Sequence, residues 1–113
     1  MSEDIFREFS RNVGELFVKP EGHQERLAHA ALGVCTEAGE IGSSVKAFWI
    51  YGREIDYYNV IEEVGDCLFY LQAIGREMGF DLDDAMRENI AKLRKRYPNG
   101  YSDKAANERA DKT

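Results

Sequence analysis

Hydrophobic residues recur at intervals of three and four positions along most of this chain. This spacing is typical of helices with one apolar face, because residues three and four apart lie on the same side of a helix. Alternation of apolar and polar residues, which would predict strands, is absent over any useful length. The pattern therefore predicts an all-α fold. The predicted helices span residues 3–17, 22–48 and 56–78, with a fourth that follows a cap at Asp81 or Asp83 and ends near residue 96.

Glycine, proline and aspartate mark the boundaries between these helices. The segment VKPEGH interrupts the pattern after the first helix, and IYGREID, with Gly52 as a stop, is expected to be a loop. Asp56 is the expected N-cap of the third helix, and Gly79 ends that helix. Pro98 closes the fourth helix. Short connections favour antiparallel neighbours, so we expect an antiparallel four-helix bundle.

Each predicted helix carries an apolar stripe that we expect to face the core. The stripes comprise Ile5, Phe6, Phe9, Val13 and Phe17 on the first helix; Leu27, Ala31, Val34, Ala38, Ile41, Val45 and Phe48 on the second; Val60, Val64, Cys67, Leu68, Leu71 and Ile74 on the third; and Leu82, Ala85, Met86, Ile90 and Leu93 on the fourth. The second and third helices are joined by a segment rich in aromatic residues: Phe48, Trp49, Tyr51, Tyr57 and Tyr58. Together with the stripe on the first helix, this cluster exceeds what one small bundle comfortably buries, which predicts at least a homodimer.

The length of 113 residues fits one small domain. We assign residues 1–102 to that domain and residues 103–113 to a polar C-terminal tail, which is either a short helix or disordered. The formal net charge is −6, without a basic patch along the folded part, which argues against binding to nucleic-acid polymers or membrane surfaces. A nucleotide substrate stays possible, since a metal ion can offset its charge.

Several features predict a cytoplasmic protein. No apolar run reaches the roughly 18 residues of a transmembrane helix, and the N-terminal segment MSEDIFREFS is too polar for a signal peptide. The two cysteines, Cys35 and Cys67, lie inside predicted helices and show no CxxC spacing. We expect them to be buried, reduced thiols, with a disulfide as the less favoured alternative.

Two pairs of carboxylates, each spaced by about one helical turn, carry the strongest chemical signal. Glu37 and Glu40 lie in CTEAGE, and Glu63 and Asp66 lie in IEEVGD. If the two helices face each other, four anionic side chains converge inside the bundle, and burying them without a partner is costly. Mg²⁺ prefers oxygen ligands and readily bridges substrate phosphates, so it would relieve this cost. For an isolated pair, a solvated helix face would be the better interpretation; for the whole set we predict a metal site.

Glycines accompany both pairs of acids. Gly39 and Gly42 lie on the second predicted helix and Gly65 on the third. Glycine costs about 1 kcal/mol relative to alanine inside a helix, and close approach of two helices would explain why it is used. Simple tolerance of glycine is an equally good explanation.

At these residues the chain resembles the MazG-like, all-α nucleoside triphosphate pyrophosphohydrolase superfamily, which also includes dimeric dUTPases and phosphoribosyl-ATP pyrophosphohydrolases. The signature of the family is an ExxE segment followed on the next helix by an ExxD segment. The surrounding segments EAGEIGSSVK, NVIEEVGDCLFYL and NIAKLRKRYPNGYS also match, so the resemblance covers roughly residues 27–102. One departure is Thr36, where many members carry a further glutamate before the first pair.

The resemblance implies an enzyme that hydrolyses a nucleoside triphosphate between the α- and β-phosphates, giving the monophosphate and pyrophosphate. It implies that Mg²⁺, or Mn²⁺, binds at the four acids, and that the protein is a dimer or tetramer. The same acids are the candidate catalytic residues, since a carboxylate that does not bind the metal directly could act as general base. Either Asn59, one turn before Glu63, or Glu62, one turn before Asp66, could support the second pair, although Glu62 could equally be a surface charge.

Further residues are candidates for binding the substrate. The resemblance favours Lys92, Arg96 and Tyr97 near the substrate, with Asn89 on the same face as Lys92. Lys46 is a second candidate cation, and Trp49 could stack on the base; the candidate substrate-binding set is thus Lys46, Trp49, Asn89, Lys92, Arg96 and Tyr97. For each cation a solvated helix end is an equally good interpretation, and for Trp49 a core or interface position is the more common one. Arg94 and Lys95 are expected to point away from this face, into solvent.

Two alternatives to a general nucleotide pyrophosphohydrolase stay open. The substrate could be phosphoribosyl-ATP, although no additional motif for its phosphoribosyl end is evident. The chain could instead be a non-catalytic helical module for oligomerisation or regulation, which keeps the acids only for stability. The basic residues near the end of the fourth helix favour catalysis over this second alternative.

Overall fold

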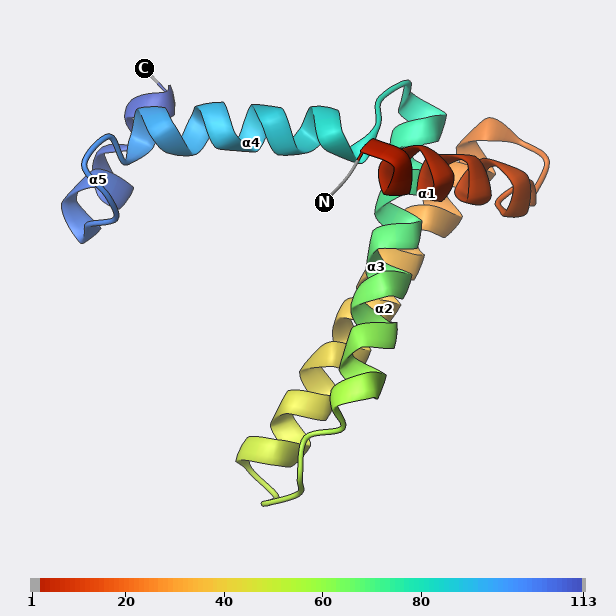
Figure 1. Cartoon of the computed structure of the whole chain (residues 1–113), viewed down its shortest axis with the longest axis horizontal. Coiled ribbons are helices and arrows are strands. Elements are labelled where there is room, and N and C mark those ends of the chain that lie inside the picture. The colour runs from red at the N-terminus through yellow and green to blue at the C-terminus, as the bar shows by residue number, and fades with distance from the viewer. Residues whose placement is uncertain (1–2, 113) are drawn as a thin grey trace. The chain divides into compact units, whose positions relative to one another are not determined.

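The protein is helical throughout the part that the structure, a computed structural model, describes: residues 3–112, with side chains from residue 4 onward. This range contains five α-helices, one 3₁₀ turn and no strand (Figure 1). They are α1 (Glu3–Leu16), α2 (His23–Trp49), α3 (Tyr57–Met78), α4 (Leu82–Arg96), α5 (Asp103–Glu108) and the 3₁₀ turn η1 (Ala110–Lys112). The all-α prediction is confirmed, and the polar tail proves to contain a short helix. The chain divides into two compact units between Phe80 and Asp81.

The helix boundaries follow the capping residues that the sequence indicated. The Asp56 side chain accepts a hydrogen bond from the Asn59 backbone N–H at 3.1 Å, which caps α3. Gly79 ends α3 in the left-handed conformation, with φ +89°, where a side chain would be strained. Asp81 and Asp84 form a capping box at the start of α4, so Asp81 rather than Asp83 is the cap. The first helix ends one residue earlier than predicted and the second one residue later.

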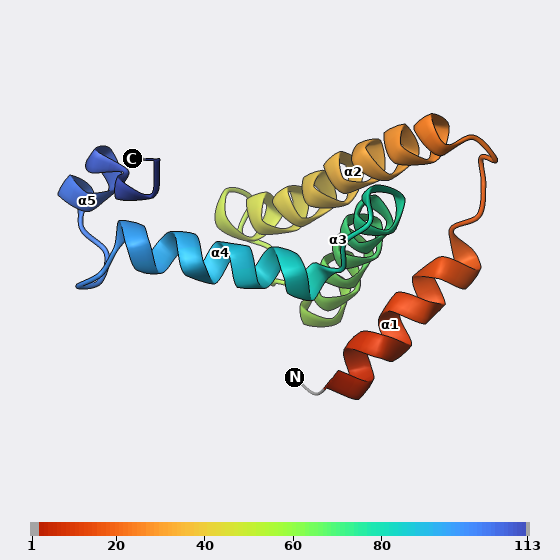
Figure 2. The same cartoon turned by 90° about the horizontal axis from the view of Figure 1, so that it is seen from above.

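The first unit is an antiparallel hairpin of two long helices with a third helix packed on it. α2 and α3 lie side by side along most of their length, and α1 packs on α3 at the end of the hairpin away from the loop that joins them (Figures 1 and 2). The core is centred on Val13, Ala30 and Ala73, each at most 1% exposed. Aromatic and aliphatic side chains surround it: Phe9, Phe17, Phe69, Tyr70 and Ile74. The hydrophobic core is therefore small and lies at one end of the hairpin.

Gly33 allows α2 and α3 to approach closely beside this core. A Cβ atom added at Gly33 would lie 2.5 Å from the Tyr70 ring, so no side chain fits there. By contrast, a Cβ atom at Gly39, Gly42 or Gly65 would meet nothing within 4 Å. The idea that these three glycines serve close helix approach is thus wrong within the described chain.

The structure corrects which helix faces are buried. On α2 the predicted core residues Ala31, Ala38, Val45 and Phe48 are exposed, as are Val64, Leu68 and Leu71 on α3. The other predicted stripe residues of these two helices are partly buried, as expected: Leu27, Val34, Ile41, Val60, Cys67 and Ile74. Small or polar residues are buried or partly buried as well. They include Gly33, Glu37, Ser44 and Ala47 on α2, and Glu63, Tyr70 and Ala73 on α3. The hydrophobic periodicity predicted the helices but not all of the residues that lie between them. Small residues lie there because they let the helices pack closely.

The second unit consists of α4 with the C-terminal segment folded onto it. The Arg96 side chain forms an ion pair with Asp111, which joins the end of α4 to η1. α5 begins at Ser102, whose side chain accepts a hydrogen bond from the Ala105 N–H at 3.0 Å. None of the residues of α4 is buried, including the predicted core residues Met86, Ile90 and Leu93. The apolar stripe of α4 is thus not covered within this unit.

Both cysteines are free thiols, which excludes the disulfide alternative for this structure. Cys67 is partly buried, and its burial raises the pKa of the thiol. Cys35 is exposed on α2, contrary to the expectation that both thiols are buried. No helix within residues 3–112 combines the length and the apolar character needed to cross a membrane.

Candidate functional site

The middle of the α2–α3 hairpin brings the two pairs of acids together. Glu37 is partly buried on α2, and Glu63 on α3 is buried, with 8% of its surface exposed. Burial raises the pKa of the Glu37 carboxyl above its ordinary value. The charges that raise this pKa further come, in order of size, from Asp66, Glu40, Glu63 and Glu62. The two pairs therefore act on one another across the hairpin, as expected if the second and third helices face each other.

Neutral side chains hold the buried carboxylate of Glu63. The Asn59 amide donates a hydrogen bond from Nδ2 to Glu63 Oε1 at 2.7 Å, and the Ser44 hydroxyl lies 3.3 Å from Oε2. Asn59 also contacts Ser44, with 3.4 Å between Nδ2 and Oγ. The supporting role expected for Asn59 is confirmed. Ser44 was missed, although its position four residues after Glu40 and seven after Glu37 places it on the same face of α2.

No cationic side chain neutralises these acids within the described residues. None of the ion pairs there involves Glu37, Glu40, Glu63 or Asp66. A buried carboxylate held by neutral donors beside three further acids is a donor set that suits a hard divalent cation. Thr36 is uncharged and adds nothing to this set of acids, and its hydroxyl donates to the Leu32 carbonyl oxygen at 3.1 Å.

The carboxylate oxygens of the four acids lie farther apart than the ligand atoms of a formed metal site. In the part of the chain that the structure describes, no three of them bring ligand atoms within 4.8 Å of one another. Like charges repel, so separated carboxylates are what electrostatics favours for these side chains alone. The residues fit a divalent cation in type, and binding it would require their side chains to move together.

A second acidic cluster at the start of α4 does meet that distance: Asp81, Asp83 and Asp84. Its oxygens already have structural partners. Asp84 Oδ2 accepts from the Asp81 N–H at 3.0 Å, and Asp83 Oδ2 accepts from Arg87 Nη1 at 2.9 Å. Capping of the helix N-terminus explains the Asp81–Asp84 contact, and an ion pair one turn along α4 explains that of Asp83. We therefore do not assign this cluster as the metal site.

The predicted substrate-binding residues of the first unit are both exposed near the hairpin loop. Trp49 ends α2 with 81% of its surface exposed, so it is not a core residue. Lys46 is also exposed, and its ammonium group lies 5.8 Å from the centre of the Tyr51 ring, a cation–π distance. Both side chains are accessible to a ligand.

The remaining candidates belong to the second unit. Asn89 and Lys92 line a pocket of 590 Å³ together with Lys95. Lys95 thus shares a face with Lys92, which corrects the expectation that it points away. Arg96 is instead engaged with Asp111. Tyr97 is partly buried, with its ring 5.2 Å from that of Tyr101.

Comparison with known proteins identifies the family. Residues 27–101 match the model of the MazG nucleotide pyrophosphohydrolase domain, and this region contains all four acids and all the candidate substrate-binding residues. Searches of curated proteins and of solved structures gave no significant match. The matched region covers well over half of the chain. The chain therefore belongs to the family of the MazG nucleotide pyrophosphohydrolase domain.

Proposed function

We propose that this protein hydrolyses a nucleoside or deoxynucleoside triphosphate between the α- and β-phosphates, releasing the monophosphate and pyrophosphate. The observation that carries the proposal is the cluster of acids on the hairpin, which lacks any cationic partner among the described residues and lies within the region matched to the family. Glu37, Glu40, Glu63 and Asp66 would hold Mg²⁺, or Mn²⁺. When bound, such an ion polarises a phosphate oxygen and offsets the charge of the substrate.

Other residues of the chain would orient the acids and bind the substrate. Asn59 and Ser44 fix the orientation of the Glu63 carboxylate, so that one member of the site is preorganised. A carboxylate of this cluster that does not bind the metal directly would act as general base, accepting a proton from the attacking water at a carboxylate oxygen. Lys92 and Asn89 would bind the phosphates, assisted by Lys46. Trp49, being exposed, is available to stack on the base.

We further propose that the protein works as a homodimer or homotetramer, in which a second copy completes the predicted helical bundle. The apolar residues left exposed on α2 and α3 support this, since Phe48 is 50% exposed and Val64 is 42% exposed. Large apolar side chains left exposed on a helix hairpin are characteristic of a protein–protein contact. A dimer of two hairpins would bury these residues against their symmetry mates.

The products test the enzymatic proposal. The full chain is incubated with a panel of common and damaged triphosphates, with Mg²⁺, with Mn²⁺ and with a chelator, and the nucleotides are separated by chromatography. We expect monophosphate and pyrophosphate, and only with a divalent cation. A phosphatase would instead release the diphosphate and orthophosphate. If no monophosphate forms with any substrate, the protein is better described as a helical regulatory module.

Glu40→Gln tests the role of the acids in turnover. A neutral amide is a poor replacement for an anionic metal ligand, so we expect turnover to be abolished. Glu54→Gln, in the exposed loop between α2 and α3, removes the same charge and should leave the rate unchanged. If both variants keep the wild-type rate, the acids do not form the site.

A further inference from the structure

The C-terminal segment beyond the family match builds one wall of a pocket on α4. The pocket has a volume of 590 Å³ and lies entirely within the second unit. α4 lines it with Ala85, Glu88, Asn89, Ala91, Lys92 and Lys95, and η1 adds Asp111 and Lys112. Since the match to the family ends at residue 101, the contribution of η1 is a feature of this chain that the match does not describe.

An ion pair holds η1 against α4. Arg96 Nε lies 2.6 Å from Asp111 Oδ1, and Nη2 lies 3.0 Å from Oδ2, so the carboxylate fills the fork of the guanidinium group. The Asp111 side chain is 4% exposed and that of Arg96 is 16% exposed. A two-point, largely buried contact of this kind fixes the position of the segment. It engages Nε and Nη2 of Arg96, whereas the lysines beside it form no ion pair among the described residues.

Three lysines are brought to the same pocket. Lys92 and Lys95 lie about one turn apart on α4, and Lys112 follows Asp111 directly. Within residues 4–112, none of the three forms an ion pair. Glu88 and Asp111 are the acids lining the pocket, and Asp111 is engaged with Arg96. Three lysines and Asn89 thus line one pocket whose lining carries an excess of positive charge, although the chain as a whole has a net charge of −6.

We propose that this pocket binds a pyrophosphate group, and that the Arg96–Asp111 pair positions Lys112 there to complete the site. The ligand is either the terminal part of the triphosphate substrate or the pyrophosphate product, which share this chemistry. The proposal rests on the proposed function and adds to it two residues, Lys95 and Lys112, and the role of the C-terminal segment. Lysine binds phosphate as a point charge with freely oriented donors, so three flexible lysines suit a group with several equivalent oxygens.

The first test measures binding of inorganic pyrophosphate to the full chain by calorimetry, at low salt and with a chelator present. The chelator prevents recruitment of pyrophosphate through divalent ions at the hairpin acids. We expect saturable binding to wild type that is weakened about two- to fivefold by Lys95→Ala or by Lys112→Ala. Lys104→Ala is the matched control, because it removes the same charge from α5, where its side chain is 85% exposed. Absence of saturable binding, or an equal loss in the control, overturns the proposal.

The second test breaks the Arg96–Asp111 pair at constant net charge. The double variant Arg96→Gln with Asp111→Asn releases η1 without altering the total charge. We expect it to weaken pyrophosphate binding by the same factor as Lys112→Ala, and we expect Lys112→Ala to have no further effect in that background. A purely structural role of the pair would not produce this loss of additivity. Wild-type affinity, tighter binding or fully additive losses would each contradict the positioning role.

A third experiment distinguishes whether the pocket binds the terminal part of the substrate or the pyrophosphate product. The same variants are titrated with a triphosphate analogue that cannot be cleaved between the α- and β-phosphates. If Lys112→Ala weakens both ligands, the pocket serves substrate and product; if it weakens only pyrophosphate, the pocket serves the product. If it weakens neither, the proposal fails. Because no turnover is measured here, these results stay separate from the monophosphate assay, which alone decides the proposed enzymatic activity.

Discussion

Glu63 shows how a single residue combines stability and function in this fold. Its carboxylate is buried at 8% exposure, yet it is held only by Asn59 and Ser44 and faces further acids across the hairpin. Burial of an anion without a cation is unfavourable, so this position costs stability that a bound cation would restore. The contact of Asn59 with Glu63 could be predicted from helical spacing, because the two residues lie about one turn apart. Ser44 could not, because serine at that spacing is common on exposed helix faces.

Metal should therefore stabilise the protein through these acids. For wild type, Mg²⁺ or Mn²⁺ at a hundredfold excess over its Kd should raise the free energy of unfolding by about 2.7 kcal/mol. Glu63→Gln should lose most of this gain, because the amide is a weaker ligand and the cluster then carries less charge. Thermal unfolding at increasing metal concentration measures both. An equal response of wild type and Glu63→Gln would falsify the assignment of the metal site.

At the scale of the helices, local signals predicted the boundaries well and the packing faces poorly. Asp56 and Gly79 act through their own backbone and nearest neighbours, so their effect can be read from a short stretch of sequence. Which face of α2 packs on α3 depends on a distant segment. Gly33 meets the Tyr70 ring across the hairpin, and nothing in the sequence near Gly33 indicates that contact.

Two glycines on the same helix give a matched test of this packing. Gly33→Ala places a Cβ atom 2.5 Å from the Tyr70 ring, so it should destabilise the protein by about 1–3 kcal/mol. At Gly39 nothing lies within 4 Å, and Gly39→Ala should instead stabilise by about 0.5–1 kcal/mol through the helix propensity of alanine. Urea unfolding without metal measures both changes. Similar changes in the two variants would show that Gly33 does not serve close approach.

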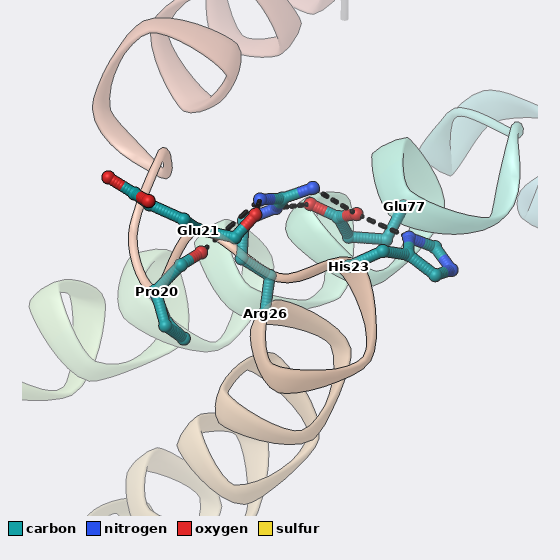
Figure 3. A network of polar contacts seen from close by, with 5 residues as sticks. All are labelled: Pro20, Glu21, His23, Arg26 and Glu77. Carbon is teal, nitrogen blue, oxygen red and sulfur yellow. Dashed lines mark hydrogen bonds and ion pairs between the residues drawn. The ribbon is translucent and has the colours of Figure 1, made fainter.

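A polar cluster at the end of the hairpin makes its stability depend on pH. Figure 3 shows the Glu77 carboxylate between Arg26 and His23, with Arg26 also bonded to the backbone carbonyls of Pro20 and Glu21. Glu77 Oε2 lies 2.7 Å from His23 Nδ1, and the Glu77 side chain is 12% exposed. The hydrogen bond from Arg26, together with that from His23, holds the pKa of Glu77 below its ordinary value, against the opposing effect of burial. The cluster thus links the segment before α2 to the end of α3.

Glu77→Gln should destabilise the protein at neutral pH, and the deficit should disappear in acid. Because the folded pKa is lowered, the contribution of the carboxylate is fully present above the unfolded value of about 4.3 and is lost as pH falls through the folded value. Urea unfolding of wild type and variant from pH 7 to pH 3 measures this difference. Glu8→Gln, on an exposed position of α1, serves as the control. A deficit that stays constant down to pH 3 would contradict the role of the charge.

At the scale of the whole molecule, more large apolar side chains are exposed on the helices than are buried in the core of the described residues. Val13, Ala30 and Ala73 form a core that is small for 113 residues, while many larger side chains on α2 and α3 remain exposed. Periodicity reveals apolar faces but does not reveal whether the same chain or a second copy covers them. For this reason the all-α class could be predicted from the periodicity, whereas the prediction of the intramolecular core residues was partly wrong. The family could be predicted from the motifs that contain the acids.

The apolar face predicts an oligomer that one charge can disrupt. Wild type should give at least a dimer mass by light scattering at micromolar concentration. Phe48→Glu places a charge on the face proposed to be buried between copies and should shift the mass towards the monomer. Leu16→Glu, at a 64% exposed position at the end of α1, should leave the mass unchanged. A monomeric wild type would rule out the proposed assembly.

The exposure of Trp49 gives the protein a built-in optical reporter. The chain has one tryptophan, and 81% of its surface is open to water at the end of α2. All indole fluorescence therefore reports on a single place beside the hairpin loop. Stacking of a nucleobase on the ring would quench the emission, whereas burial between two copies would shift it to shorter wavelength. One spectrum recorded along two titrations, of nucleotide and of protein, thus separates ligand binding from self-association without any added label.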